Sequence, residues 1–438
     1  MFTPKSSSNC IYFVLYVLIA VCWTSCSKSG SGTGSSGSSG TSGQMTPTIS
    51  SIAPDSGALN STVVITGTNF SSNTSQDLVS FNGVTASISS ATSTQLTVVV
   101  PQGAGTGAVK VNVNGQGATG PVFNYIYTYV VSTLAGGTQG FLDGTGTAAE
   151  FADPYGIAVD TAGNIIVADD GSSSIRKVTP NGVVTTLTGG PGYQDGPVAS
   201  SQFLHPLGVT VDAANNIYVA DAGNHKIRII NNSNMVTTIA GSTEGYADGP
   251  VSVAQFEFPW NLAVASNGNI YVICEDPYIR VISGNTVSTV YNGKNYSPPF
   301  ITFADIINGP GNTLLVEDGG FDIYSLTTSG MLTVLAGNGQ YAYADGPAMS
   351  ASFNHPVSMA IDPRGNIIVA DNNNYRIRMI SPAGVVSTIA GSGVKGIQDG
   401  PGATAQFENP LGVAVDKSGN IYVSEDEFSY RIRKITVE

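Results

Sequence analysis

Short runs of alternating apolar and polar residues, separated by Gly, Asn, Pro and Asp-Gly, extend over most of this 438-residue chain. An apolar residue at every second position places the apolar side chains on one face of a β-strand, so each run predicts a half-buried strand. The residues between the runs favour tight turns, because Gly adopts positive φ angles and Asn and Asp bond to nearby backbone. The pattern predicts an all-β protein of many short strands.

Residues 47–128 are predicted to form the first folded domain. Its predicted strands are Thr62–Thr66, Leu78–Phe81, Gln95–Val100 and Ala108–Val113. Several short antiparallel strands within about 80 residues are typical of a small β-sandwich. The segments Pro47–Pro54, Val64–Phe70 and Val79–Gly83 resemble an IPT/TIG domain, an immunoglobulin-like module. The resemblance implies a spacer or interaction module rather than a catalyst.

The remainder of the chain, 129–438, is repetitive. A Gly-Asn pair followed by apolar residues recurs with variants, and its Asn positions are Asn164, Asn216, Asn269, Asn312, Asn366 and Asn420. A period of about 50 residues indicates an array of similar supersecondary units. Each period contains four strand-like runs, which is typical of one blade of a β-propeller. The sequence therefore predicts six blades.

The two ends of the repetitive region predict how the ring closes. The last strand-like run, Arg431–Thr436, corresponds to the third strand of a repeat. The missing fourth strand has the sequence type of Val386–Gly391, and a copy of that type stands at the front as Val131–Gly136. We therefore expect this N-terminal strand to complete the last blade, which leaves no exposed sheet edge in the ring.

Three motifs within the repeats resemble NHL repeats. They are F-x-x-P-x-G-[IV]-[AT]-V-D, G-N-I-[IY]-V-[AS]-[DE] and R-I-R, and both Phe151–Asp160 and Phe407–Asp416 carry the first motif in full. The resemblance covers essentially all of 130–438, with a shorter, degenerate fourth repeat at about 292–336. It implies a six-bladed NHL-type propeller.

The first 46 residues are predicted to target and tether the protein. Ile11–Val21 is an apolar run of signal-peptide length, too short for a comfortable transmembrane helix. It ends near Cys26 in a sequence that resembles a bacterial lipobox, which implies a lipoprotein signal peptide at 1–25 and lipid attachment at Cys26. Ordinary secretion with cleavage nearby is the alternative. Residues 26–46 are rich in Ser, Gly and Thr and predict a flexible tether.

These segments predict a lipid-anchored protein of the bacterial cell envelope, in the outer membrane, with the leaflet left open. A net charge of −13 disfavours a nucleic-acid partner, because such a chain repels phosphate groups. After loss of the signal peptide only Cys26 and Cys274 remain, so no internal disulfide is expected. Cys274 follows an apolar run and is expected to be a small buried side chain. We expect a monomer.

An Asp-Gly pair precedes the innermost strand of five repeats. The pairs begin at Asp143, Asp195, Asp248, Asp345 and Asp399. Asp and Gly both favour turns, which predicts an architectural role. Calcium in each loop is the alternative, although one carboxylate is few for a cation that takes six to eight oxygens. Carboxylates also follow the second strands, and the third-strand Arg residues are expected to form ordinary surface pairs with several of them.

The residue before the innermost-strand Pro varies among the repeats, which makes it a candidate for function. It is Asp153, His205, Phe258, His355 or Asn409. It should face the mouth of the central channel, and His205 and His355 belong to opposite blades. One hypothesis is a propeller lyase or lactonase that uses His205, His355, Asp153 and Asn409, with zinc or calcium at the mouth. The favoured alternative is a polar rim without a cofactor.

Aromatic residues support a binding site at the same mouth. Trp260 and Tyr155 follow the Pro where other repeats have aliphatic residues, and flat rings beside polar groups suit sugar stacking but also fill cores. The fourth repeat lacks the Asp-Gly loop and carries Tyr296, so we expect a notch in the rim beside Trp260. The predicted ligand-binding residues are Trp260, Tyr155, His205, His355, Asp153, Asn409 and Tyr296.

The sequence thus favours non-enzymatic binding of a glycan or a protein at the loop-rich face of the propeller. TIG-plus-NHL lipoproteins resemble accessory components of Bacteroidota surface systems, some of which handle glycans. This resemblance implies an envelope binding protein.

Overall fold

The computed structural model describes residues 45–295, 302–426 and 428–438, and there the chain consists of β-strands joined by turns and short 3-10 helices. The expected all-β class is confirmed. The signal peptide, Cys26 and nearly all of the tether lie outside the described residues, as does Tyr296. Within the described ranges no helix is long and apolar enough to cross a membrane.

The first folded region is an antiparallel β-structure with one parallel pair, β2 with β8. Its elements are β1 (Thr48–Ala53), β2 (Ser56–Gly57), β3 (Thr62–Thr68), η1 (Thr74–Gln76), β4 (Asp77–Phe81), β5 (Val84–Ala91), β6 (Gln95–Val99), β7 (Gly107–Val113) and β8 (Gln116–Tyr125). They are hydrogen-bonded in the order β1-β3-β6-β5-β4-β7-β8-β2. Val63 and Ile65 of β3 are buried with Phe81 and Phe123, whose rings meet edge to face at 4.9 Å.

The four strands predicted in this region are present as β3, β4, β6 and β7. The pattern of alternating apolar and polar residues did not predict β1, β5 and β8. These strands contain many exposed Ser, Thr and Gly residues and few alternating apolar side chains. Their places in the sheet are fixed by pairing with the apolar strands, as β5 with β6 and β8 with β7.

Six further sheets are the blades of the propeller, numbered here in chain order. Blade 1 consists of β10 (Gly144–Thr145), η2 (Gly146–Ala148), β11 (Pro154–Val159), β12 (Ile165–Asp169), η3 (Asp170–Ser172), β13 (Ser174–Val178) and β14 (Val183–Gly189). Blade 2 consists of β15 (Gly196–Pro197), β16 (Pro206–Val211), β17 (Ile217–Asp221), η4 (Ala222–Asn224), β18 (Lys226–Ile230) and β19 (Met235–Ala240). Blade 3 consists of β20 (Gly249–Pro250), β21 (Pro259–Val264), β22 (Ile270–Cys274), β23 (Tyr278–Ser283), β24 (Thr286–Asn292) and η5 (Gly293–Asn295). Blade 4 consists of β25 (Asp305–Asn308), η6 (Pro310–Asn312), β26 (Thr313–Glu317), β27 (Ile323–Thr327) and β28 (Leu332–Ala336). Blade 5 consists of β29 (Gly346–Pro347), η7 (Ala348–Ser350), β30 (Pro356–Ile361), β31 (Ile367–Asp371), η8 (Asn372–Asn374), β32 (Arg376–Ile380) and β33 (Val385–Ala390). Blade 6 consists of β34 (Gly400–Pro401), β9 (Tyr129–Gly136), β35 (Pro410–Val415), β36 (Ile421–Glu425) and β37 (Arg431–Val437).

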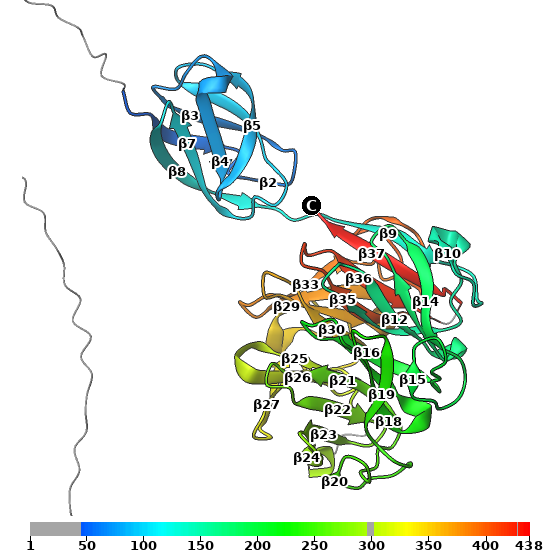
Figure 1. Cartoon of the computed structure of the whole chain (residues 1–438). Helices are drawn as coiled ribbons and strands as arrows, with labels where there is room; N and C mark the ends of the chain where they lie inside the picture. Colours follow the sequence, from blue (N-terminus) through cyan, green and yellow to red (C-terminus); the bar gives the residue numbers. More distant parts are fainter. Residues whose placement is uncertain (1–44, 296–301, 427) are drawn as a thin grey trace, which may run out of the picture. The chain divides into compact units, whose positions relative to one another are not determined.

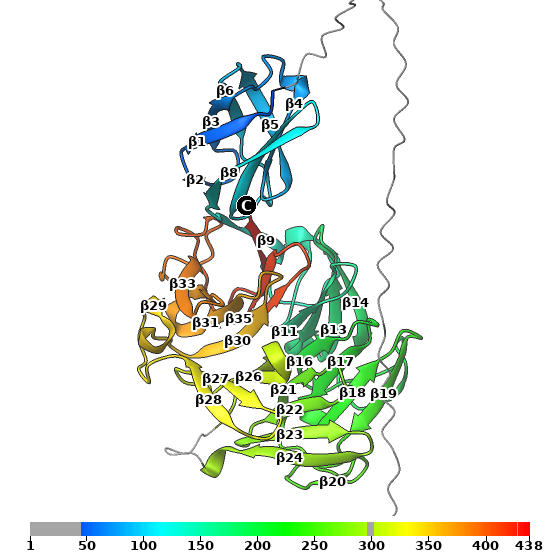
Figure 2. The same ribbon diagram turned by 90° about the vertical axis from the view of Figure 1, so that its left-hand side faces the viewer.

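The blades form a closed ring. The innermost strands β11, β16, β21, β25, β30 and β35 contact one another in this order, and β35 also contacts β11; several of them lie together in the middle of Figure 2. In the last blade β9 pairs with β37, with Ala135 opposite Ile432 and Tyr129 opposite Val437. Figure 1 shows the red strand β37 beside β9. The predicted closure by an N-terminal strand is confirmed.

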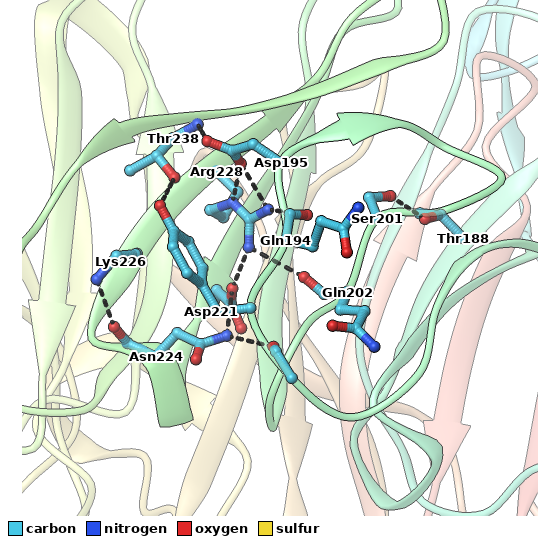
Figure 3. Close-up of polar contacts among 12 residues, drawn as sticks. Thr188, Gln194, Asp195, Ser201, Gln202, Asp221, Asn224, Lys226, Arg228 and Thr238 are labelled. Atoms are coloured by element: carbon cyan, nitrogen blue, oxygen red, sulfur yellow. Dashed lines mark hydrogen bonds and ion pairs between the residues drawn. The ribbon is translucent and has the colours of Figure 1, made fainter.

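A buried Arg links the outer edge of a blade to its second strand, as Figure 3 shows for blade 2. Arg228 of β18 donates from Nε to Asp195 of the Asp-Gly pair at 2.9 Å, and from Nη1 to Asp221 at the end of β17 at 2.6 Å. The Asp195 carboxylate also accepts the backbone N–H of Thr238 in β19, the strand next to the Asp-Gly strand, at 3.0 Å. The Asp-Gly pair therefore holds a blade together, as predicted.

Aromatic rings and backbone carbonyls complete this network. The rings of Tyr193 and Phe203 lie 5.0 and 4.8 Å from the central carbon of the Arg228 guanidinium. The same acid–Arg–acid arrangement recurs as Asp143–Arg176–Asp169, Asp345–Arg378–Asp371 and Asp399–Arg433–Glu425. The expectation of weak surface pairs is wrong, because the Arg side chains and their second-strand partners are fully buried. Breaking a buried pair leaves an uncompensated charge.

Blades 3 and 4 depart from this arrangement. In blade 3, Cys274 occupies the second-strand position of the acid and is fully buried, as expected, so among the described residues the one salt-bridge partner of Arg280 is Asp248. In blade 4, Tyr324 occupies the Arg position, and among the described residues no salt bridge reaches the fully buried Glu317. Within the described residues, blade 4 has four strands and lacks the Asp-Gly strand that the other blades have.

Replacement of Arg378 by Met should destabilise the propeller by about 3–5 kcal/mol, because Asp371 is left buried without a cation. Arg280→Met in blade 3 is the matched control. In blade 3 the second-strand acid is replaced by Cys274, and the nearby buried Asp276 forms no salt bridge with Arg280 within the described residues, so the loss should be smaller by at least about 1 kcal/mol. Urea unfolding followed by tryptophan fluorescence measures both losses. Equal losses of stability in the two variants would show that the buried, unpaired carboxylate of Asp371 is not the cause.

Candidate functional site

The mouth of the central channel is formed where the innermost strands begin and the second strands end. The carbonyl of Asp153 accepts the N–H of Asp170, the first residue after the second strand, at 2.9 Å. The carbonyl of His205 accepts from Ala222 in the same way at 3.2 Å, and His355 repeats the contact in blade 5. The fold uses only the backbone at this position, which leaves the side chain free to vary among the blades.

The imidazole of His205 pairs with a carboxylate of the neighbouring blade. Its Nδ1 lies 2.9 Å from Oδ1 of Asp170, and 53% of the His205 side chain is exposed. Burial raises the pKa of Asp170, and the hydrogen bond with His205 opposes this rise. His205 has a φ of +49°, a conformation uncommon for residues with a side chain, so its neighbours hold it in place. The pair presents an oriented imidazole at the mouth surface.

A second polar group spans blades 5 and 6. The side chain of His355 hydrogen-bonds with Asn372, and burial lowers the pKa of His355. Nδ2 of Asn372 donates to Oδ1 of Asn409 at 2.7 Å, and Nδ2 of Asn409 donates to Asp426. The structure therefore brings His355 and Asn409 together through Asn372, and leaves His205 in a separate pair.

The mouth does not offer a recognisable metal donor set. Within residues 45–295, 302–426 and 428–438, no three His, Cys, Asp or Glu side chains lie close enough to hold a metal ion. The two His residues of opposite blades have different polar partners, Asp170 and Asn372. Catalytic zinc usually takes three protein ligands and calcium takes six to eight oxygens, so these residues fit neither ion.

Tyr155 and Trp260 narrow the channel beneath the mouth. Their ring centroids lie 6.3 Å apart in an edge-to-face arrangement. With Val357 and Leu411 they line a space of ≈ 20 Å³, room for about one water molecule. A Cβ on Gly208, at the same level, would lie 2.6 Å from the Trp260 carbonyl oxygen, so the strand contact requires Gly. The two rings act as a constriction.

The carboxylates around the constriction affect Tyr155. Burial raises the pKa of its hydroxyl, and Asp426 and Glu317 raise it further by repulsion of the phenolate. The indole N–H of Trp260 is buried and has no hydrogen-bond partner among the described residues. The constriction therefore contains one neutral hydroxyl and one unpaired donor.

The notch predicted beside Trp260 would be bounded by 292–300, of which 296–300 lie outside the described residues. In the described part, Trp260 packs against the core between blades 3 and 4, which includes Phe303 and Tyr291. Trp260 therefore contributes both to this core and to the constriction.

Three polar side chains below the constriction were missed by the sequence analysis. Asn261, Asp305 and Ser358 occupy the position that holds Gly in the other three blades, namely Gly156, Gly208 and Gly412. They line a cavity of ≈ 280 Å³ enclosed by the innermost strands. Comparing the second residue after the Pro among the repeats would have found Asn261 and Ser358. Asp305 was hidden because blade 4 lacks the Pro that sets the register.

Asp305 lies at the centre of this polar group. It accepts from Nδ2 of Asn261 at 2.5 Å and from the N–H of Met359 at 2.5 Å. Burial raises its pKa to about 7, although backbone hydrogen bonds lower it. Glu317 lies opposite Asp305 on the adjacent strand, and burial followed by repulsion from Asp318 raises its pKa well above the usual range. Blade 4 thus carries carboxyl groups without the Arg that other blades supply.

Two domain families match the chain. The IPT/TIG domain family matches residues 47–129, and the NHL repeat family matches residues 203–230 and 353–378. Together with the six sheets, these matches define the class of protein: a TIG domain followed by a six-bladed propeller with NHL repeats.

Known proteins share this architecture in part. The chain is 28% identical over 309 residues to the Arabidopsis thaliana protein SUPPRESSOR OF QUENCHING 1, chloroplastic, covering 62% of this chain and 29% of that protein. The chain spans less than half the length of this protein and of the other curated relatives that it matches. A solved Bacteroides thetaiotaomicron protein of unknown function has a TM-score of 0.63 and 22% identity, covering 90% and 99% of the two chains. A Bacteroides ovatus auxiliary nutrient binding protein has a TM-score of 0.57 and 20% identity, with the same coverage. At these identities the structures show a shared fold.

Asp305→Asn should change how stability depends on pH. The pKa of Asp305 is about 7 in the fold and ordinarily 3.8, so folding favours the protonated carboxyl. Its contribution to stability is fully present below about pH 4 and is lost as the pH rises to about 7. The stability advantage of the native protein over Asp305→Asn should therefore shrink by on the order of 2 kcal/mol between pH 5 and pH 8. Urea unfolding at both pH values measures this, and a constant advantage would mean that Asp305 is ionised throughout.

Proposed function

We propose that the protein is a cell-envelope lipoprotein that binds a ligand without catalysis at the channel mouth of its propeller. Acylation at Cys26 would anchor it in the bacterial outer membrane, and the tether 26–46 would hold the folded domains away from the bilayer. The ligand is a glycan or a protein, and the chemistry of the mouth favours a glycan. The protein would act as a monomer, without a cofactor.

The observation that carries this proposal is the set of oriented polar groups around an aromatic constriction. Asp170 fixes the exposed imidazole of His205, while Asn372 and Asp426 fix the amide of Asn409. Groups held in place by their neighbours lose little conformational freedom on binding, which favours recognition of hydroxyl-rich ligands. Trp260 adds an indole N–H that lacks a partner among the described residues.

Exposed aromatic rings at the outer edges of the blades give further support. Tyr193, Tyr246 and Tyr343 each cover a buried Arg with one face, and 50%, 42% and 44% of these residues are exposed. Flat exposed rings beside polar groups suit stacking with sugars. The Bacteroides ovatus protein of the same fold is described as an auxiliary nutrient binding protein. A nutrient glycan is therefore the ligand class that we propose first.

The double variant His205→Ala/Asn409→Ala should weaken glycan binding by at least tenfold, about 1.4 kcal/mol, because it removes two oriented polar groups. A panel of neutral and acidic oligosaccharides, followed by titration calorimetry with any that bind, provides the measurement. Lys417→Ala is the control, since this exposed residue lies in the turn between the first and second strands of blade 6, at the other end of the blade. Unchanged affinity in the double variant would remove the mouth as the binding site.

A second candidate function, a propeller lyase or lactonase, is favoured by one observation. The pair of His205 and Asp170 at 2.9 Å is the arrangement that orients an imidazole as a general base. In this alternative His205 would act with His355, Asp153 and Asn409. Turnover of lactones or of uronate-containing oligosaccharides that disappears in His205→Ala, while binding persists, would establish it. Stoichiometric zinc or calcium in the purified protein, lost in His205→Ala/His355→Ala, would add a metal to this alternative.

A further inference from the structure

A hollow of ≈ 970 Å³ lies between blades 3 and 4 at the end of the propeller opposite the mouth. Its walls come from the turns between the first and second strands of blades 2, 3 and 4, and from the facing strands of blade 3. Its polar lining includes Tyr271, Asn269, Asn267, Ser283, Asn308 and Asn312. Its size falls within the range of about 300–1,000 Å³ that small-ligand sites occupy.

The hollow lies at the place that the segment after the Asp-Gly strand occupies between other blades. Between blades 2 and 3, Val251 follows the Asp-Gly strand and packs among Tyr218, Ile239 and Ile270. Val198 and Ala348 pack at the corresponding place between blades 1 and 2 and between blades 4 and 5. The core between blades 3 and 4 contains no residue of this kind among those described, since blade 4 lacks the Asp-Gly strand.

The same blade interface has also lost the carboxylate that occupies polar groups in other blades. In blade 2, Oδ2 of Asp212 accepts from Nδ2 of Asn216 at 2.7 Å and from the hydroxyl of Tyr218 at 3.2 Å. Blade 6 repeats this with Asp416, Asn420 and Tyr422. These contacts hold the amide and the hydroxyl inside the turn.

In blade 3 the acid is replaced by Ala265, although the turn keeps the same backbone hydrogen bonds. The amide of Asn269 and the hydroxyl of Tyr271 therefore have no hydrogen-bond partner in the described part of the chain. Tyr271 is only 3% exposed, and both residues line the hollow. A hydroxyl and an amide that line one cavity without a partner among the described residues are groups that a ligand can satisfy.

The rest of the lining defines the chemistry of that ligand. Asn267, Asn308 and Asn312 add amide groups, and Ser283 adds a hydroxyl. Oδ1 of Asn267 already accepts from the N–H of Asn269, and Nδ2 of Asn308 already donates to the carbonyl of Val264, so the other ends of these two amides remain for a ligand. The lining includes no Lys or Arg among the described residues, and its one carboxylate, Asp212, is already hydrogen-bonded within its own turn. Val281, Val290 and Leu314 supply apolar surface. Neutral donors and acceptors beside apolar surface match a sugar, which has hydroxyl edges and a C–H face.

We propose that this hollow binds a neutral monosaccharide or disaccharide. The hydroxyl of Tyr271 and the amide of Asn269 make the central hydrogen bonds, and the sugar fills the space that Val251 fills one blade earlier. The site is separate from the mouth and goes beyond the function proposed above, so either site can exist without the other.

Ala265→Asp is the most direct test, because it restores the carboxylate of the repeat. The introduced carboxylate should accept from Asn269 and Tyr271, as Asp212 accepts from its neighbours in blade 2, so the variant should fold with an unchanged or higher Tm. Maltose, cellobiose and lactose serve as probes, with saturation-transfer NMR and titration calorimetry as readouts. At least one should bind the native protein, and Ala265→Asp should weaken that binding at least tenfold.

Two controls keep the outcomes separate. Ala162→Asp adds the same charge to an exposed position in the corresponding turn of blade 1 and should leave binding unchanged. The mouth variant His205→Ala/Asn409→Ala should also leave it unchanged. Failure of all three sugars to bind the native protein, or equal binding by Ala265→Asp, overturns the proposal. Loss of binding in the mouth variant alone overturns it too, and supports the mouth as the saccharide site.

Discussion

A guanidinium buried in the third strand is the interaction on which the propeller depends. Arg228 reaches Asp221 in the middle of the blade and Asp195 at its outer edge, while Tyr193 and Phe203 exclude water from the group. A charge buried in this way is costly unless it is paired and hydrogen-bonded. The motifs that recur along the chain are the parts of this one arrangement, so their repetition reflects the demands of burying a cation in five of the six blades.

Blades 3 and 4 lack parts of this Arg–acid arrangement. Cys274 replaces one acid in blade 3, and in blade 4 Tyr324 replaces the Arg and no Asp-Gly strand is present within the described residues. This part of the ring carries buried carboxyl groups without a salt bridge among the described residues, at Asp305 and Glu317, and the hollow between blades 3 and 4. The irregular part of the ring thus carries polar groups in addition to those of the mouth.

Comparison of the repeats predicted much of the candidate site but not its connections. His205 and Asn409 stood out because they differ from their counterparts, and the structure gives each of them an oriented position at the mouth. Their partners could not be predicted, because Asp170 and Asn372 lie on neighbouring blades and the distance between blades is set by packing. The position of Asp305 could not be predicted for a related reason. Its strand register follows from pairing with Glu317 and not from a sequence motif.

The sequence by itself determined the class of fold, the six blades and the closure by Val131–Gly136, because strand alternation and repeated turns are local properties that survive in a single chain. It also separated the repeated Asp-Gly pairs from the variable residues at the mouth. Only the tertiary structure decided that the Arg–Asp pairs are buried, that Asn269 and Tyr271 lack partners among the described residues, and that a hollow separates blades 3 and 4. These features depend on which surfaces of neighbouring blades meet. Whether a side chain is buried, and whether a space between blades is filled, is decided only when those surfaces pack together.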